Sequence, residues 1–205
     1  MCNHGRVDTA PARRPPVSAT RDRVLEAARV VLGEDPDAGM GEIASAAGVV
    51  RRTVYGHFPS RTELVRDLGQ RAVGEIAAVL DEVEDAGRPA DEVWARFIAR
   101  LWPVVDRYRV LVVLRRGEHG PDIHALLGPV EEVLAGLVAR GQASGVFGRH
   151  LPADVLSRIA WSALFAIADH ELPEGTAAVR AVTVTTLLLL GVPEPRAAGL
   201  AADAG

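Results

Sequence analysis

The stretch MGEIASAAGVVRRTVYGHFPSR, residues 40–61, decides the fold of this chain. Its pattern predicts two short helices joined by a turn centred on Gly48. Glycine suits that turn because the residue after a helix often adopts a left-handed backbone conformation, which side chains disfavour. Ala44 is small where two crossing helices approach each other. The apolar residues that fill the wedge between the helices are Ile43, Ala47, Val49 and Val54. This layout is typical of a helix-turn-helix, whose second helix lies in the DNA major groove.

The second helix of this unit has the polar groups that a DNA-reading helix needs. Arg51 and Arg52 stand at its N-terminal end, where a guanidinium can make a bidentate contact with guanine worth about 1–3 kcal/mol of discrimination. Thr53, Tyr55 and His57 offer donors for phosphate oxygens. The pattern predicts a half-site that contains guanine. For Tyr55, packing as an aromatic prop of the domain is an alternative role that can coexist with a phosphate contact.

From about Thr20 to Asp67 the sequence resembles the DNA-binding domain of the tetracycline-repressor-like (TetR) family of transcriptional regulators. The matching motifs are EIASAAGV at 42–49, TVYGHF at 53–58 and SRTEL at 60–64. Over the rest of the chain the resemblance covers architecture only. The DNA contacts that it implies are Met40, Gly41, Arg51, Arg52, Thr53, Tyr55, His57 and Arg61. The sequence departs from the family pattern at Gly39, Val50 and Gly56, so the operator sequence does not follow from the motif.

Composition and charge agree with a regulator inside the cell. The chain has 205 residues and a net charge of −4, which argues against indiscriminate binding to nucleic acid. Residues 1–66 hold ten arginines against eight acidic residues, net +2, whereas residues 67–205 hold thirteen against nineteen, net −6. Cys2 is the only cysteine, so an intrachain disulfide is impossible. With no secretory signal and no membrane span in the pattern, we expect a soluble cytoplasmic protein without a membrane partner.

The hydrophobic periodicity predicts an all-α fold of about nine helices in two domains. Residues 1–19 should form a disordered basic tail, either solvated or lying in a neighbouring minor groove. Residues 20–67 should form the three-helix DNA-binding domain, and residues 68–192 an effector-binding and dimerisation domain, before a frayed tail at 193–205. Ser60 and Glu63 predict a capping box that starts a helix at Arg61 and leads it into the second domain.

The last two predicted helices are apolar nearly all round. The segments are Ile159 to Ala168 (IAWSALFAIA) and Thr183 to Leu190 (TVTTLLLL). A helix of this kind must be covered on more than one side. We therefore expect a homodimer through these helices, as the resemblance also implies; a monomer with a central helix hairpin is the alternative. A two-fold dimer would bind double-stranded DNA at the two half-sites of a palindromic operator.

The resemblance further implies that the second domain encloses a small-molecule effector. We predict a mostly apolar pocket with a polar anchor from Arg115, His119 or His170. The other residues predicted to line it are Trp94, Phe97, Leu101, Trp102, Trp161 and Phe165. Ordinary core packing is the alternative for each aromatic residue. The effector would favour the arrangement of the two DNA-binding domains that does not match the operator, so that a repressor is released from DNA.

No residue pattern indicates catalysis, a metal site or a cofactor. Glu118, His119, Asp122 and His124 have metal-ligand residue types, but their spacing matches no known site and a solvated loop is the better interpretation. Two competing functional classes stay open. An all-helical enzyme would show a cleft with perturbed titratable groups. A ligand-independent DNA-binding protein would show a tightly filled second domain.

Overall fold

The computed structural model describes residues 17–115, 117, 119–170 and 175–204, and over these residues the chain is all-α, as predicted. The described helices number ten. In chain order they are α1 (Val17–Glu34), α2 (Met40–Ala46), α3 (Arg51–His57), α4 (Arg61–Val83), α5 (Ala90–Arg107), α6 (Arg109–Leu114), α7 (Gly120–Ser144), α8 (Ala153–Ala168), α9 (Thr176–Leu189) and α10 (Glu194–Asp203).

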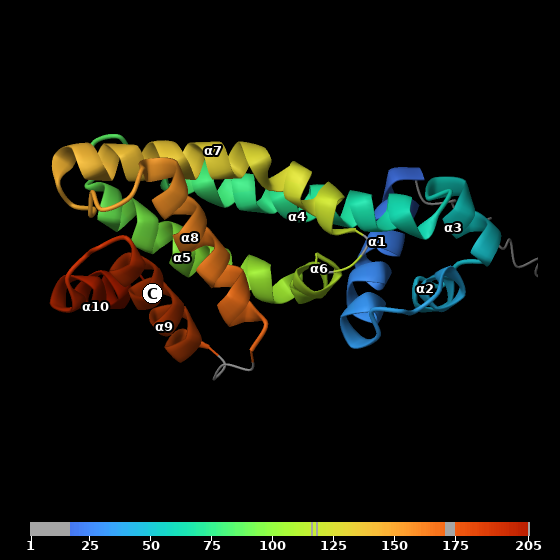
Figure 1. The fold of residues 1–205 in the computed structure, drawn as a ribbon. Helices are drawn as coiled ribbons and strands as arrows, with labels where there is room; N and C mark the ends of the chain where they lie inside the picture. The colour runs from blue at the N-terminus through green and yellow to red at the C-terminus, as the bar shows by residue number, and fades with distance from the viewer. Residues whose placement is uncertain (1–16, 116, 118, 171–174, 205) are drawn as a thin grey trace, which may run out of the picture.

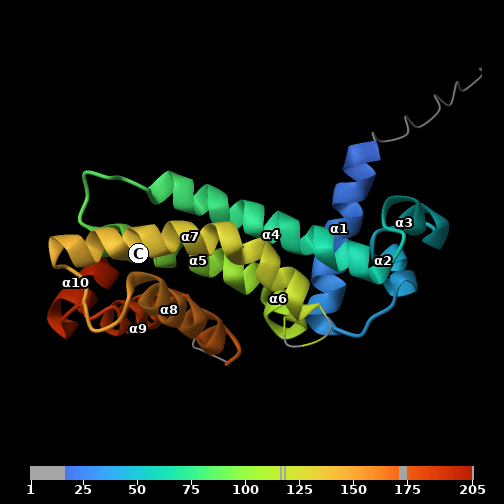
Figure 2. The ribbon, with the colours of Figure 1, turned by 45° about the horizontal axis from the view of Figure 1, so that its top comes forward.

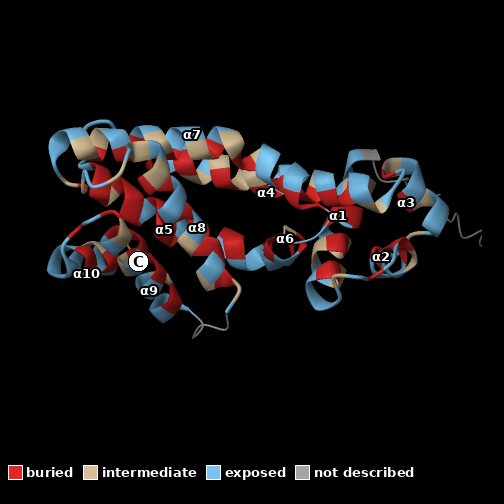
Figure 3. Cartoon of the chain, viewed as in Figure 1, coloured by how far each residue is buried: buried red, intermediate tan, exposed pale blue. Residues whose placement is uncertain are grey.

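The molecule is elongated, and its two ends are built from different parts of the chain (Figure 1). Helices α1, α2 and α3 form one end, and α8, α9 and α10 lie toward the other. Helix α4 begins beside α1 and extends into the second part, where α7 runs alongside it in both ribbon views (Figures 1 and 2). Buried residues follow the inward faces of these helices along the whole length of the molecule (Figure 3).

Helix α4 begins where the sequence predicts. Ser60 is its N-cap, and the Ser60 hydroxyl accepts a hydrogen bond from the amide of Glu63 at 3.1 Å, which satisfies one of the free donors of the first turn. The buried stripe of α4 includes Leu64 and Leu68 near α1 and continues to Ile76 and Val83. One continuous helix therefore connects the two parts of the molecule without a flexible linker.

The C-terminal residues correct the sequence-based prediction of a frayed tail at 193–205 and of nine helices. Residues 194–203 form the tenth described helix, α10, which packs on α9 and α5. Ala197 and Ala201 are buried, and Arg196 is paired with Asp91 of α5. This alanine-rich segment has little apolar pattern of its own, so its helix depends on contacts with residues that are far away in the sequence.

The N-terminal boundary also differs from the prediction. Helix α1 begins at Val17, so residues 17–19 of the predicted disordered tail are helical. Residues 1–16 of that tail lie outside the described residues. Over the described ranges, the model contains no helix that is both long and apolar enough to cross a membrane.

Candidate nucleic-acid interface and internal pocket

The turn between α2 and α3 has the geometry that its sequence predicts. Gly48 adopts a φ of 64°, in the left-handed region that favours glycine. The amide of Val49 donates back to the carbonyl of Ala44 at 3.0 Å, which closes the end of α2. Ile43 and Val54 are fully buried between the two helices. The packing of these residues fixes the angle between α2 and α3, so the outward side of α3 has a defined orientation.

The outward side of α3 exposes two arginines and a tyrosine. Arg51 and Arg52 are exposed, and the Tyr55 side chain is 41% exposed. The guanidinium of Arg51 lies 5.6 Å from the centre of the Tyr55 ring, and its Nη2 donates to the Tyr55 hydroxyl at 3.3 Å. Tyr55 thus orients Arg51 through a cation–π contact and a hydrogen bond. Val50, which precedes α3, is 67% exposed beside them.

The remaining predicted DNA contacts occupy less accessible positions. Thr53 and His57 are half-buried on α3. The Met40 side chain is buried and Gly41 is half-buried, so these first residues of α2 would contact a phosphate through backbone amides rather than side chains. Helix α2 has no side-chain N-cap; instead, the Glu42 carboxylate accepts from the amide of Gly39 at 2.7 Å.

Arg61 lies at the junction between the two parts of the molecule. It donates to the carbonyl oxygen of Pro36, in the loop before α2. Its Nη1 is also 3.2 Å from Nε2 of His119, the N-cap of α7. The predicted phosphate contact of Arg61 would therefore require the guanidinium to leave these partners. The predicted pocket residue His119 is located at this same junction.

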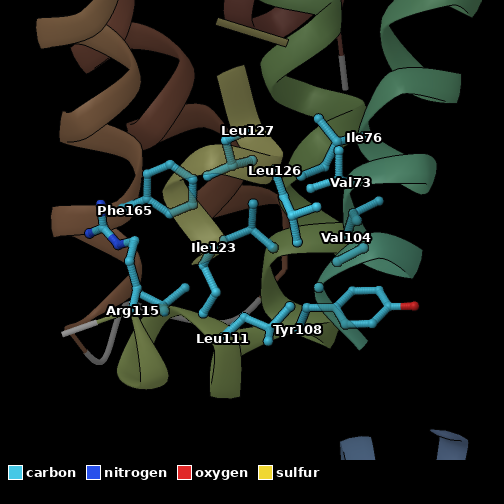
Figure 4. Close-up of a pocket in the computed structure, with 14 residues that line it drawn as sticks. Val73, Ile76, Val104, Tyr108, Leu111, Arg115, Ile123, Leu126, Leu127 and Phe165 are labelled. Carbon is cyan, nitrogen blue, oxygen red and sulfur yellow. The ribbon is translucent and has the colours of Figure 1, made fainter. Parts of the chain in front are cut away.

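A narrow apolar cavity of about 40 Å³ lies between α4, α5, α6, α7 and α8 (Figure 4). Of the residues that the sequence predicts for a pocket, Arg115 and Phe165 line this cavity. The sequence-based prediction missed the rest of the lining, which is Gly69, Ala72, Val73, Ile76, Val104, Val105, Tyr108, Leu111, Val112, Ile123, Leu126 and Leu127. The apolar periodicity of α4 marks Ala72 and Ile76 as inward-facing, but it does not distinguish a cavity wall from a filled core.

The other predicted pocket residues do not line this cavity. Trp94 is fully buried, and its indole N–H donates to Thr186 of α9 at 3.1 Å. Phe97 is stacked on Trp161, with ring centres 6.2 Å apart. Leu101 is buried and Trp102 is half-buried, and neither contributes to the cavity wall. For these residues the structure agrees with ordinary core packing.

Arg115 is the charged group of the cavity. Its guanidinium carbon lies 4.6 Å from the centre of the Phe165 ring. The Nε of Arg115 is buried and has no hydrogen-bond partner among the described residues. A cation–π contact compensates only part of the cost of removing a cation from water. A residue that lines the cavity therefore carries a buried donor without an acceptor among the described residues.

Tyr108 provides the other polar group at the cavity wall, but its hydroxyl already has a partner. The hydroxyl points away from the cavity (Figure 4) and donates to a carboxylate oxygen of Glu75 at 2.6 Å. Burial, followed by the hydrogen bond and the negative charge of Glu75, raises the pKa of the Tyr108 phenol to about 12. The same carboxylate accepts from Arg107 at 2.9 Å.

The cavity wall is connected to the helix-turn-helix end by polar contacts. Arg29 of α1 donates to the carbonyl oxygen of Arg107 at 3.1 Å, next to Tyr108. Arg29 is also paired with Glu26 of α1, and this hydrogen bond lowers the pKa of the Glu26 carboxyl and raises the pKa of Arg29. Helix α1 therefore contacts the backbone of the residue that precedes Tyr108 in the cavity wall.

The described polar residues near the start of α7 contact other protein groups. Asp122 is 3.5 Å from the guanidinium of Arg66, and His124 Nδ1 is 3.0 Å from the carbonyl oxygen of Gly120. Glu118 lies outside the described residues. Over the described part of the chain, no group of three or more His, Cys, Asp or Glu side chains has an arrangement that could hold a metal ion.

Comparison with known proteins identifies relatives of the N-terminal part. The family model for bacterial regulatory proteins of the tetR family matches residues 24–68. The HTH-type transcriptional repressor LfrR of Mycolicibacterium smegmatis is 37% identical over 79 residues, which are 38% of this chain and 42% of LfrR. An HTH-type transcriptional regulator of Mycobacterium tuberculosis is 40% identical over 87 residues, with the same shares. The match thus spans less than half of the length of these relatives.

Solved structures extend the similarity to the whole fold. The structure of LfrR in complex with proflavine has a TM-score of 0.66 and 25% identity, and the alignment covers 82% of this chain and 94% of that one. The structure of RolR in complex with resorcinol has a TM-score of 0.63 and 22% identity, covering 92% of this chain and 96% of that one. The second comparison shows a shared fold only.

Proposed function

We propose that this chain is a regulator of the TetR family that binds a palindromic operator as a homodimer and represses transcription until a small effector releases it, since the family model matches residues 24–68 and a transcriptional repressor is 37% identical over 79 residues. The outward side of α3 supports this proposal most directly. Arg51 and Arg52 are exposed at the start of the helix, and Tyr55 orients Arg51. A guanidinium that is already oriented loses less conformational freedom when it contacts a guanine edge.

The DNA-binding part of the proposal is tested by selecting operators from a genomic library, followed by footprinting on the selected sites. The full-length protein should recover a palindrome whose half-sites contain guanine. Arg51→Ala should lower the affinity for that palindrome by about 1–3 kcal/mol and relax the preference at one base position. Tyr55→Phe keeps the ring beneath Arg51 and loses the hydroxyl, so it should weaken binding to all sequences to a similar extent.

The controls for this experiment are Arg88→Ala, in the loop between α4 and α5, and the unselected library. Arg88 is exposed and pairs with Asp85 and Glu92 close to it in the sequence, so the change should leave the operator affinity intact. Failure to enrich any palindrome, or equal losses for Arg51→Ala on selected and random DNA, would contradict the proposed sequence recognition.

The proposed homodimer uses the outward sides of α8 and α9. Ile159 of α8 and Leu188 of α9 are 42% and 43% exposed, respectively, although both are large apolar residues. Smaller side chains surround them, including Ser162, Ala166 and Ala181, which are exposed as well. Two such helix pairs from different subunits would bury this surface in a four-helix bundle.

The proposed response to an effector rests on the cavity and its connections. LfrR and RolR have each been solved with a small molecule, proflavine and resorcinol, respectively. In this chain two contacts connect the cavity wall with the helix-turn-helix end. Tyr108 neighbours the Arg107 carbonyl that Arg29 of α1 contacts, and His119, the N-cap of α7, lies beside Arg61. Ligand pockets usually enclose several hundred cubic ångströms, so a cavity of about 40 Å³ corresponds to a closed state that a ligand would widen.

A further inference from the structure

We infer that the cavity selects an effector with one anionic head group, a carboxylate that pairs with Arg115, and a flexible aliphatic tail. The inference deepens the proposed function, because it specifies the chemical class of the effector. It depends on three observations: the buried Nε of Arg115, which has no partner among the described residues, the apolar character of the remaining wall, and the position of Glu75 beside Tyr108.

The guanidinium of Arg115 requires an anion at this position. It stands at one end of the cavity beside Phe165 (Figure 4), and its buried Nε has no acceptor among the described residues. None of the described residues that line the cavity carries a carboxylate. A ligand carboxylate could accept two parallel hydrogen bonds from a guanidinium, which is the strongest pairing available to this side chain. A ligand cation would place two like charges together in an apolar site.

Glu75, an acidic residue that contacts the cavity residue Tyr108, is paired with groups other than Arg115. Its carboxylate accepts from Tyr108 and Arg107 on the outer side of the wall, and Arg71 lies 3.9 Å away. The Tyr108 hydroxyl points out of the cavity toward Glu75 (Figure 4). Tyr108 therefore offers apolar carbon atoms, and not its hydroxyl, to the cavity. The cavity thus has one polar end.

The rest of the cavity suits a flexible aliphatic chain. Opposite Arg115, the wall is formed by branched apolar side chains of α4 and α5, including Val73, Ile76 and Val104 (Figure 4). A narrow cavity of about 40 Å³ has to widen for any organic ligand. A chain with rotatable bonds can follow such a space, and burial of each methylene contributes about 0.8 kcal/mol.

The test compares three probes that have the same tail and different head groups: octanoate, octan-1-ol and octylamine. Their affinities for the full-length protein are measured by isothermal titration calorimetry at neutral pH. Octanoate should bind at least about tenfold more tightly than octylamine and should also be preferred over octan-1-ol. In Arg115→Met, which keeps the length and apolar volume of the side chain, the affinity for octanoate should fall at least about tenfold and its preference over octylamine should disappear.

Arg109→Met is the matched control, because Arg109 is exposed at the start of α6, the helix whose C-cap is Arg115, and its ion-pair partner among the described residues is Asp106, at 4.0 Å. It should keep the octanoate preference of the unmodified protein. Equal octanoate affinity in the protein and in Arg115→Met, a preference for octylamine, or no binding of any probe would overturn the inference. Operator binding without a probe is measured for each variant. If the unmodified protein did not bind the operator, the proposed function would be contradicted. The head-group preference would still show whether the cavity selects an anionic ligand.

Discussion

Two polar residues at one apolar cavity, Arg115 and Tyr108, differ in how their polar groups are satisfied. Tyr108 is buried and donates its hydroxyl to Glu75 outside the cavity, whereas the Nε of Arg115 has no acceptor in the described part of the chain. A satisfied pair of this kind stabilises the closed wall, while an unsatisfied donor favours a ligand. We therefore expect Tyr108 to affect the stability of the protein and Arg115 to affect which ligand it binds.

Tyr108 should make the stability of the protein depend on alkaline pH. The folded protein retains the phenol proton until pH about 12, whereas an unfolded tyrosine loses it near pH 10. Between these values the unfolded state binds fewer protons than the folded state, so the free energy of unfolding falls as pH rises; below about pH 10 this contribution is constant. In urea unfolding between about pH 9 and 11, Tyr108→Phe should reduce the fall by roughly 1 kcal/mol.

Tyr55→Phe is the control for this experiment, because it removes the other tyrosine, which is exposed on α3. It should leave the alkaline fall of the unmodified protein in place. If Tyr108→Phe and the unmodified protein lost stability in parallel over this pH range, the Tyr108 phenol would not be the group responsible.

At the scale of elements, α10 depends on an ion pair with α5. Asp91 is 0% exposed, and its partner Arg196 on α10 has a side chain that is 48% exposed. The hydrogen bond to Asp91 raises the pKa of Arg196, so the cation is present throughout the accessible pH range. Arg196→Met would leave Asp91 buried without its cation. Partial solvent screening reduces the usual cost of such a loss, and we expect a decrease of about 1–3 kcal/mol in the free energy of unfolding.

Urea unfolding at pH 7 checks this expectation, with Arg158→Met as the matched control. Arg158 and Asp154 form an exposed pair 3.4 Å apart on α8, and its loss should change stability by less than about 0.5 kcal/mol. Combining Asp91→Asn with Arg196→Met should recover part of the stability, because the buried charge is then removed. Equal effects of the two single arginine changes would rule out a special role for the Asp91 pair.

At the scale of the whole molecule, the exposed apolar residues of α8 and α9 predict how subunits associate. The double change Ile159→Glu and Leu188→Glu places charges where the proposed interface would bury apolar groups, so the protein should sediment as a monomer in analytical ultracentrifugation. Without the second subunit the affinity for a complete palindrome should fall by about 100-fold or more. Val133→Glu, at an exposed valine of α7, should retain the association state of the unmodified protein. A double variant that stayed dimeric would place the interface elsewhere.

The sequence by itself determined the helix-turn-helix, because its signals are local. The left-handed Gly48, the buried pair Ile43 and Val54, and the Ser60 N-cap all act within a few residues of their own positions. Periodicity likewise predicted the all-α class, since the same pattern of apolar residues defines the inward face of each helix.

Only the tertiary structure decided which inward-facing residues would surround a cavity and which would fill the core. Periodicity places Trp94 and Phe165 equally inside, but Trp94 bonds to Thr186, 92 positions later, whereas Phe165 meets Arg115 at the cavity wall. Helix α10 forms for the same kind of reason, because its pairing with Asp91 spans 105 positions. Packing partners at such separations depend on how whole helices cross, and the pattern within one helix does not contain that information.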